Sequence, residues 1–246
     1  MLGARAGRLR ADLALEQLRA FSYSVSHDLQ SPLQRIGSFA QLLEREIGPQ
    51  PSGSRAELYL ARIQANAEEM VQLVQGLLLL AEVSQADIVR GRVDLSAIAT
   101  EILEGLQAES PARQVRWHVA PDLVVLGDVR LMRSVMENLL GNAWKFTAQR
   151  EVAEITVGGS VSRGEFFVRD NGAGVDMAHA DKLFGTFHRL HRQDEFPGTG
   201  IGLATVARAL QRQGGAVHGE SEPGRGATFR FTMPVPADAA PAALPA

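Results

Sequence analysis

The chain has 246 residues, 45% of them hydrophobic and 22% charged, which is enough for one large or two modest globular domains. Its formal net charge of −3, without any run of Lys or Arg, argues against nucleic acid or a lipid surface as a partner. The absence of cysteine excludes disulfides and thiolate metal sites and fits a reducing compartment, so the cytoplasm is the expected location.

Hydrophobic segments in the sequence are short. The longest uninterrupted apolar run, "LLLLA" at 77–81, is far below the roughly 20 residues that a membrane span requires. The start, "MLGARAGRLRADL", contains no apolar signal segment. We therefore expect neither membrane insertion nor export of this chain.

The first predicted element is a helix from Leu9 to about Ile47. At about 100° per residue, one apolar stripe lies opposite His27, so the imidazole is expected to point away from the buried face. The residues of this stripe are Leu18, Val25, Leu29, Ile36 and Leu43.

This helix is interrupted by a proline at an unusual place. Pro32 follows His27 by five residues in "VSHDLQSPL", although proline inside a helix costs about 3 kcal/mol. Pro32 has no N–H, so the carbonyl of Asp28 loses its helical partner, and the ring crowds that carbonyl. We expect the helix to bend beside His27.

A second helix follows the loop "GPQPSGS" at 48–54. Its apolar positions alternate spacings of four and three, as in the seam of a bundle. Two such helices form an antiparallel hairpin that cannot cover both apolar seams alone, so we expect a dimeric four-helix bundle. The seam residues are Ile63, Ala67, Met70, Val74, Leu77 and Ala81.

A mixed pattern replaces the heptads from about residue 84 to Val235. Helices are predicted at 95–108, 128–146 and 200–213, and strands at "VRWHV", "EITVGG", "EFFVRD", "GAVHGE" and "ATFRFTM". Helices with mostly paired strands favour an α/β layer rather than a regular βαβ repeat, which makes the whole chain α+β. The Pro/Ala-rich end, "PVPADAAPAALPA", is predicted to be a disordered tail or linker.

Three segments of this region could bind a ligand. In "MENLLGNAWKFT", Asn138, Asn142 and Lys145 stand at i, i+4 and i+7 and form one polar stripe beside an apolar arc. An asparagine carbonyl oxygen suits Mg²⁺, and Lys145 could meet a phosphate. A solvated helix face with one capping amide would explain the same stripe.

The second segment, "VRDNGAGVDM", ends a predicted strand at Asp170, followed by Gly172 and Gly174. Glycines there let the backbone approach a ligand closely, and the aspartate can accept a hydrogen bond from an exocyclic amine. Taken alone, the segment is equally typical of a plain turn.

The third segment, "FPGTGIGLATVARAL", places Gly198, Gly200 and Gly202 ahead of a helix, where backbone N–H groups can hold phosphate oxygens. A dinucleotide fingerprint would need its third glycine at position 203, which is Leu203. A Walker loop would need Gly-Lys, which does not occur.

Five motifs in this order resemble those of sensor histidine kinases: "SHDLQSPL", "ENLLGNAWKF", "DNGAG", "LFGTFHRLH" and "GTGIGLA". The resemblance implies a dimerisation and phosphoacceptor hairpin at about 9–86. It also implies an ATP-binding domain of the gyrase type, an α/β two-layer sandwich, at about 92–235, with the disordered tail at 236–246. "RLHRQDEFPGTGIGL" also resembles kinases attached to phytochrome light sensors.

The resemblance implies roles for individual residues. His27 would be the phosphoacceptor and Asp28 the acid that orients the imidazole and accepts its proton. Ser31 stands where many relatives have Thr or Asn, which are linked to dephosphorylating the regulator, so phosphatase activity is in doubt.

In the ATP-binding domain, the resemblance makes Asn142 the Mg²⁺ ligand and Asp170 the reader of the adenine amino group. The residues that would line the triphosphate or shape the base pocket and lid are Asn138, Lys145, Gly172, Gly174, Gly198, Thr199, Gly200 and Gly202. Phe184 and Phe187 would help the lid region to dock.

The implied activity is autophosphorylation of a histidine from Mg-ATP and transfer of the phosphoryl group to an aspartate of a separate response regulator. The protein would be a homodimer whose upstream sensor lies outside this chain. One alternative is an ATP hydrolase of the gyrase type, but its catalytic glutamate would stand at Asn138, and Glu137 points about 100° away. A second alternative is a degenerate kinase that acts as a dimeric scaffold, which the retention of His27, Asn142 and Asp170 disfavours.

Overall fold

The computed structural model describes residues 34–45, 48, 54–83, 87–177, 183–185, 196 and 200–236. Several sequence predictions fall outside these residues: those on His27, Asp28, Ser31, Pro32, Phe187, Gly198 and Thr199, and the tail beyond residue 236. The chain divides into two compact units, Met1–Glu82 and Val83–Ala246, which are described separately.

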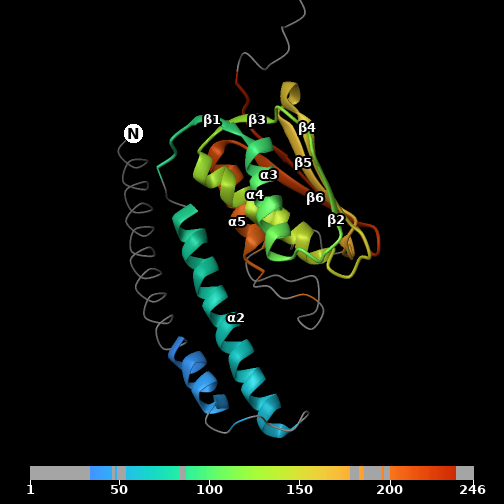
Figure 1. The fold of residues 1–246 in the computed structure, drawn as a ribbon. Coiled ribbons are helices and arrows are strands. Elements are labelled where there is room, and N and C mark those ends of the chain that lie inside the picture. The colour runs from blue at the N-terminus through green and yellow to red at the C-terminus, as the bar shows by residue number, and fades with distance from the viewer. Residues whose placement is uncertain are drawn as a thin grey trace, which may run out of the picture. The chain divides into compact units, whose positions relative to one another are not determined.

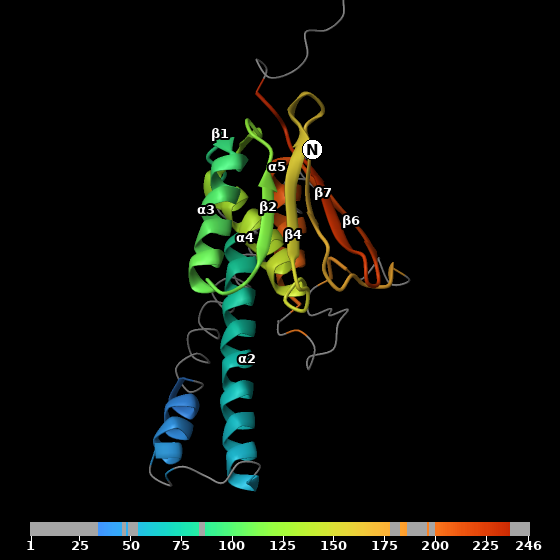
Figure 2. The ribbon, with the colours of Figure 1, turned by 45° about the vertical axis from the view of Figure 1, so that its right-hand side comes forward.

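The first unit contains a helical hairpin. Residues 34–45 are helical, Gly48 and Ser54 are not, and α2 spans Arg55–Val83. The two helices lie side by side (Figures 1 and 2), with Gln64 Nε2 donating to Glu44 Oε2 at 3.2 Å. Over the described residues, this arrangement agrees with the two predicted helices.

The hairpin buries one apolar seam and exposes another. The buried residues are Ala40 on the first helix and the heptad-spaced Leu60, Ala67 and Val74 on α2. A second set of apolar side chains is 43–67% exposed in the single chain: Ile36, Phe39, Leu42, Leu43, Leu58, Tyr59, Ile63 and Met70. One hairpin therefore leaves an apolar seam uncovered, as the heptad pattern predicted.

The second unit is a two-layer sandwich of one sheet and three helices. The sheet has the order β2-β4-β5-β7-β6, in which β2 and β4 are parallel and the other neighbours antiparallel. Its strands are β2 (Val115–Val119), β4 (Ala153–Ser160), β5 (Glu165–Asp170), β6 (Ala216–Glu222) and β7 (Gly226–Thr232). The helices α3 (Leu95–Glu109), α4 (Val129–Phe146) and α5 (Gly202–Gln213) cover one face of it (Figures 1 and 2). These eight elements match the eight that the sequence predicted.

Three short elements were not predicted. Strands β1 (Gly91–Asp94) and β3 (Val124–Gly127) form a separate antiparallel pair, and η1 (Val161–Arg163) is a single 3₁₀ turn between β4 and β5. Four-residue strands are too short to show a period of two, so the hydrophobic pattern cannot reveal them. Asp94 ends β1 and caps α3, because its side chain accepts a hydrogen bond from Ala97 N–H at 2.9 Å.

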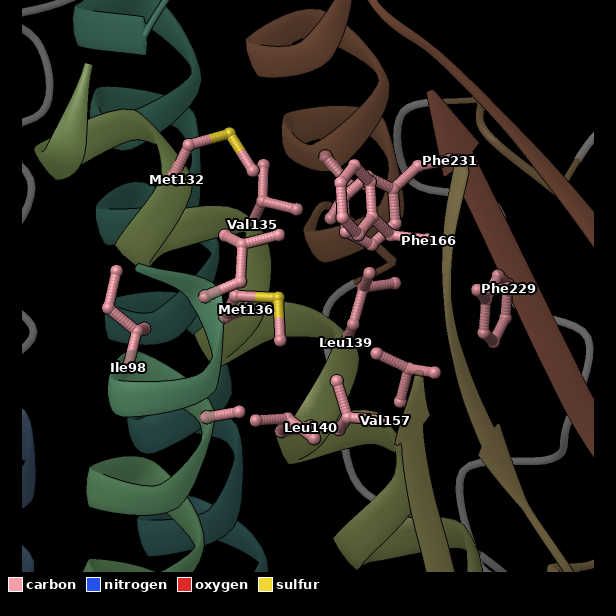
Figure 3. Packing of buried hydrophobic residues seen from close by; sticks show 14 of the residues in the cluster. Ile98, Met132, Val135, Met136, Leu139, Leu140, Val157, Phe166, Phe229 and Phe231 are labelled. Atoms are coloured by element: carbon pink, nitrogen blue, oxygen red, sulfur yellow. The ribbon is translucent and has the colours of Figure 1, made fainter. Parts of the chain in front are cut away.

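The core lies between the sheet and the helices. Inward residues alternate along the strands, and the rings of Phe166 on β5 and Phe231 on β7 stack at 5.6 Å between centroids. Figure 3 shows these rings facing the apolar side of α4, which carries Met132, Val135, Met136, Leu139 and Leu140, all fully buried. At about 1.5–3 kcal/mol for each large apolar side chain, this packing fixes α4 and so places its polar stripe at the edge of the core.

Candidate functional site

The polar stripe of α4 lies at the border of the core, as its spacing predicted. Asn138, Asn142 and Lys145 are all half-buried. The amide of Asn138 donates to the carbonyl of Ser134 at 2.8 Å, whereas the amide of Asn142 makes no hydrogen bond with the residues that the structure describes. Lys145 Nζ lies 4.3 Å from the ring centroid of Phe146.

Asn138 lies directly against the start of α5. A Cβ atom on Gly202 would stand 2.5 Å from Asn138 Oδ1, which is closer than real Cβ contacts come. A side chain at position 202 would therefore require the Asn138 amide to move. The structure thus brings together two of the predicted site residues that are far apart in the sequence.

No side chain of the residues that the structure describes caps the first turn of α5. Its N-cap residue, the buried Ile201, forms no capping hydrogen bond, and no acidic residue stands in the first turn. Just before it, Gly200 has φ +72°, a conformation that favours glycine. The N–H groups at the start of a helix are available to an anion when no side chain satisfies them.

The carboxyl group of Asp170, at the end of β5, is buried, and hydrogen bonds to one of its two oxygens hold it in place. Oδ1 accepts hydrogen bonds from the backbone N–H of Gly172 at 2.8 Å and of Ala227 at 3.3 Å. Oδ2 accepts none from the described part of the chain. Burial raises the pKa of the Asp170 carboxyl to about 6, although these two hydrogen bonds and the charge of Arg150 act to lower it.

The glycines after Asp170 permit close backbone contacts. A Cβ atom on Gly172 would stand 2.7 Å from the carbonyl oxygen of Phe146 and 2.7 Å from Asp170 Oδ1. Gly174 has φ +63°, and a Cβ atom there would overlap the carbonyl oxygen of Glu222. The backbone N–H of Ala173 donates to the carbonyl of Phe146 at 3.0 Å, which joins this loop to the end of α4.

Two side chains that sequence reasoning missed also hold this loop. Arg150 donates to the carbonyls of Asn171, Gly172 and Gly224, and Asn171 Oδ1 accepts from the N–H of Glu154 at 2.9 Å. Asn171 stood inside the quoted motif and its residue type favours such turn bonds, so it could have been proposed. Arg150 had no local signal, because its partners are carbonyls from distant loops.

The aromatic residues of this region pack at the same end of α4. The rings of Phe146 and Phe196 meet edge to face at 5.2 Å, and Phe196 is buried. Phe184 is half-buried and packs against the core.

Amides and a lysine from α4, a carboxylate from β5 and uncapped N–H groups from α5 thus belong to one neighbourhood. Within the described ranges there is no group of three or more His, Asp or Glu side chains able to hold a metal ion. A metal in this neighbourhood would take few protein ligands, and the unbonded amide of Asn142 supplies an oxygen of the kind that Mg²⁺ accepts. The donor set therefore fits Mg²⁺ shared with a phosphate ligand.

Glu137, the carboxylate nearest the position of a gyrase-type catalytic base, is exposed, whereas Asn138 faces α5. An amide cannot act as a general base, so the arrangement disfavours water activation from this helix. None of the helices that the structure describes is both long and apolar enough to cross a membrane.

Family models match both parts of the chain. Residues 17–86 match the His Kinase A (phospho-acceptor) domain, and residues 127–237 match the histidine kinase-, DNA gyrase B-, and HSP90-like ATPase. The matches agree with the order of the two segments that the motifs implied.

Curated relatives are similar over most of the chain. Cyanobacterial phytochrome A of Nostoc sp. is 34% identical, covering 89% of this chain and 29% of the relative. The phosphate regulon sensor protein PhoR of Pseudomonas aeruginosa is 33% identical, covering 87% of this chain and 50% of the relative. The chain thus spans from under a third to a half of the length of these two relatives.

Among solved structures, full-length ShkA in complex with AMPPNP is similar with a TM-score of 0.61 and 26% identity, covering 87% of this chain and 45% of that chain. A phosphoacceptor segment is thus followed by an ATP-binding fold, with the site residues of α4, β5 and α5 in one neighbourhood. The chain belongs to the two-component sensor histidine kinases, of which it comprises the core with its phosphoacceptor and ATPase-type domains.

Proposed function

We propose that this chain transfers the γ-phosphoryl group of ATP to His27 and then to an aspartate of a separate response regulator. The observation that carries the proposal is the buried carboxylate of Asp170. Oδ1 is bonded to two backbone N–H groups, and Oδ2 remains able to accept a hydrogen bond, as the amino group of adenine would require.

The remaining residues around Asp170 suit the rest of the nucleotide. Gly172 and Gly174 shape the base pocket, and the uncapped first turn of α5 meets the phosphates. The residues assigned to the triphosphate and the lid are Asn138, Lys145, Gly198, Thr199, Gly200 and Gly202. The relative ShkA, solved with AMPPNP, supports a nucleotide at this fold.

Asn142 is assigned to Mg²⁺. Its amide oxygen is available, and Mg²⁺ usually completes its coordination with nucleotide phosphates and water. When bound, the ion would offset negative charge on the triphosphate. The other donors available to that charge are the N–H groups of α5 and the ammonium group of Lys145.

In the first step, a neutral imidazole nitrogen of His27 forms a bond to the γ-phosphorus while the bond to the bridging β,γ-oxygen breaks. ADP leaves with the electron pair, and Asp28 takes the imidazole proton. The protein contributes mainly alignment and electrostatic stabilisation. A carboxylate oxygen of the regulator then bonds to the phosphorus of the phosphoramidate while the phosphorus–nitrogen bond breaks, and the imidazole of His27 leaves with the electron pair.

Other assignments follow from the family. We assign 9–86 to the dimerisation and phosphoacceptor hairpin, 92–235 to the ATP-binding domain and 236–246 to a tail. The uncovered apolar seam of the hairpin supports a homodimer, and the lack of cysteine supports a cytoplasmic location. Ser31 would serve any dephosphorylation of the regulator.

Labelling with γ-labelled ATP and Mg²⁺ tests the function. The protein-bound label should be stable in alkali and labile in acid, as a phosphoramidate is. His27→Gln should abolish labelling while ATP binding stays unchanged. Label that survives acid, or that persists in His27→Gln, would contradict the proposal.

Two further variants separate a kinase from a scaffold. Asn142→Asp and Asp170→Asn should each weaken ATP binding and slow labelling. Glu137→Gln changes an exposed neighbour on the same helix and should leave both unchanged. A chain that forms dimers but neither binds ATP nor becomes labelled would instead be a scaffold.

A further inference from the structure

The side chain of Arg150 joins two loops that flank Asp170. Arg150 follows the end of α4 and is half-buried. Its Nε donates to the carbonyl of Asn171 at 2.7 Å, and its Nη2 donates to the carbonyls of Gly172 at 2.8 Å and Gly224 at 2.6 Å. One guanidinium group therefore bonds the loop after β5 and the turn between β6 and β7.

These two loops lead to the hydrogen-bond donors of Asp170. The N–H of Gly172 comes from the loop after β5, and the N–H of Ala227 comes from β7, just beyond the turn that contains Gly224. Both donors converge on Oδ1 of Asp170. Ala227 is also the register partner of Asp170 in the β5–β7 ladder, so Arg150 adds a side-chain link between segments that already meet there.

The same loops touch through their backbones. Gly224 N–H donates to the carbonyl of Ala173 at 2.6 Å, and a Cβ atom on Gly226 would overlap the carbonyl oxygen of Asp170. The uncharged side chain of Ser221 also links them, since its hydroxyl accepts a hydrogen bond from Val175 N–H and donates one to the carbonyl of Gly226, each at 2.8 Å. Arg150 is the charged side chain that links the two loops through hydrogen bonds.

We propose that Arg150 is a positioning residue for nucleotide binding, which holds both loops so that Asp170 keeps Oδ1 bonded and presents Oδ2 to the adenine amino group. This inference rests on the proposed function, because it takes Asp170 to be the residue that meets the base. Arg150 acts through Asp170 and need not touch the nucleotide.

The charge of Arg150 gives this role a pH signature. Burial raises the pKa of Asp170, and Arg150 opposes that rise electrostatically. Other charged groups on the surrounding elements are Lys145, Glu154, Arg169, Glu222 and Arg225. Glu222 and Arg225 pair with each other at 3.0 Å, and Arg150 is the charged group that acts on the pKa of Asp170.

The test compares Arg150→Gln and Arg150→Lys in the full chain. The dissociation constant for ATP is measured by calorimetry from about pH 5.5 to 8.5 for the wild type and for each variant. The affinity of each protein is then divided by the affinity of the same protein that also carries Asp170→Asn. This ratio removes the titration of the ATP phosphates, which affects both proteins equally. For the wild type, the ratio should fall as the pH drops through about 6.

For Arg150→Gln, the midpoint of this fall should move to higher pH. Its affinity at pH 7 should drop about tenfold, since several charge-assisted bonds are lost, and should recover in part at pH 8.5. Arg150→Lys should keep the wild-type midpoint but bind a few-fold more weakly, because an ammonium group cannot reproduce the planar fork. Arg150→Lys also serves as the test if the glutamine variant does not fold.

Arg163→Gln is the matched control. Arg163 is exposed, makes no side-chain hydrogen bond with the described residues and lies in the β4–β5 turn, at the other end of these strands from Asp170. It should match the wild type at every pH.

If Arg150→Gln loses the same affinity at all pH values and keeps the wild-type midpoint, Arg150 only stabilises the loops and does not act through Asp170. That result would overturn the proposal. Wild-type affinity in both Arg150 variants would also overturn it. If Asp170→Asn alone binds ATP like the wild type, the assignment of Asp170 to adenine falls first, and the role of Arg150 falls with it.

Discussion

The side-chain oxygen of Asn138 on α4 lies against Gly202 at the start of α5, so that a Cβ atom on residue 202 would stand 2.5 Å from it. The Asn138 amide also donates to the carbonyl of Ser134, so its Oδ1 is held on the side of Gly202. This contact sets the distance between the polar stripe of α4 and the uncapped N-terminus of α5. Gly202 therefore lies where the two parts of the proposed phosphate site, on α4 and on α5, meet.

Gly202→Ala should weaken ATP binding about tenfold, or about 1.4 kcal/mol. The new methyl group would displace the Asn138 amide or push α5 away from α4. Calorimetric titration with ATP measures the effect.

Gly105→Ala is the control for this substitution. Gly105 lies in α3 with nothing within 4 Å of a new Cβ atom. This variant should bind ATP normally and raise the free energy of unfolding by up to about 1 kcal/mol, since alanine favours helix. Unchanged ATP affinity in Gly202→Ala would show that the spacing is not critical.

Asp170→Asn should stabilise the nucleotide-free ATP-binding domain at alkaline pH. The pKa of Asp170 is raised to about 6, so the folded state binds the proton more tightly than the unfolded state does. In the wild type, stability from this group is fully present below the unfolded pKa near 4 and is lost as the pH rises through 6. Removing the charge should raise the free energy of unfolding at pH 8 by about 1–3 kcal/mol.

Urea unfolding followed by tryptophan fluorescence measures this change, because both tryptophans, Trp117 and Trp144, lie in the second unit. Asp122→Asn is the control, since Asp122 is exposed and its φ of 58° suits asparagine. A less stable Asp170→Asn protein at pH 8 would show that the carboxylate contributes more through its hydrogen bonds than it costs through burial.

Asp128→Asn should have the opposite effect. The buried side chain of Asp128 caps α4 by accepting from Arg130 N–H, and it also accepts from Val89 N–H and the Arg130 guanidinium. Hydrogen bonds from Arg130 lower the pKa of Asp128 well below its ordinary value. Its stabilisation is therefore present above the unfolded pKa near 4 and is lost as the pH falls below that value.

At pH 7 the Asp128→Asn variant should lose about 2 kcal/mol of unfolding free energy. The same fluorescence assay measures this, again with Asp122→Asn as the control. The difference from the wild type should shrink below pH 4. A loss that stays constant down to pH 2 would exclude the charge of Asp128 as its cause.

Phe39→Asp should prevent the hairpin from dimerising. Phe39 is 67% exposed in the single chain and belongs to the uncovered apolar seam, where a charge would be buried in a dimer. Sedimentation velocity should show a monomer for this variant and a dimer for the wild type. Gln41→Asp places the same charge on a different, polar side of the same helix and should remain dimeric. A dimeric Phe39→Asp protein would place the interface elsewhere.

Much of the fold was predictable because its signals are local. Apolar residues at a period of 3.6 marked α3, α4 and α5, and β-branched or aromatic runs marked the five strands of the sheet. The four-residue strands β1 and β3 were missed, because their pairing with each other, rather than their own pattern, makes them strands.

The candidate site divides in the same way. The sequence by itself determined that Asn138, Asn142 and Lys145 share one helix face and that Asp170 ends a strand, since both follow from the repeat of a single element. Only the tertiary structure decided that Gly202 meets Asn138, that Arg150 bonds two distant loops and that Asp170 is buried enough to shift its pKa. Contacts and desolvation depend on which elements pack together, and no local spacing in a chain encodes that.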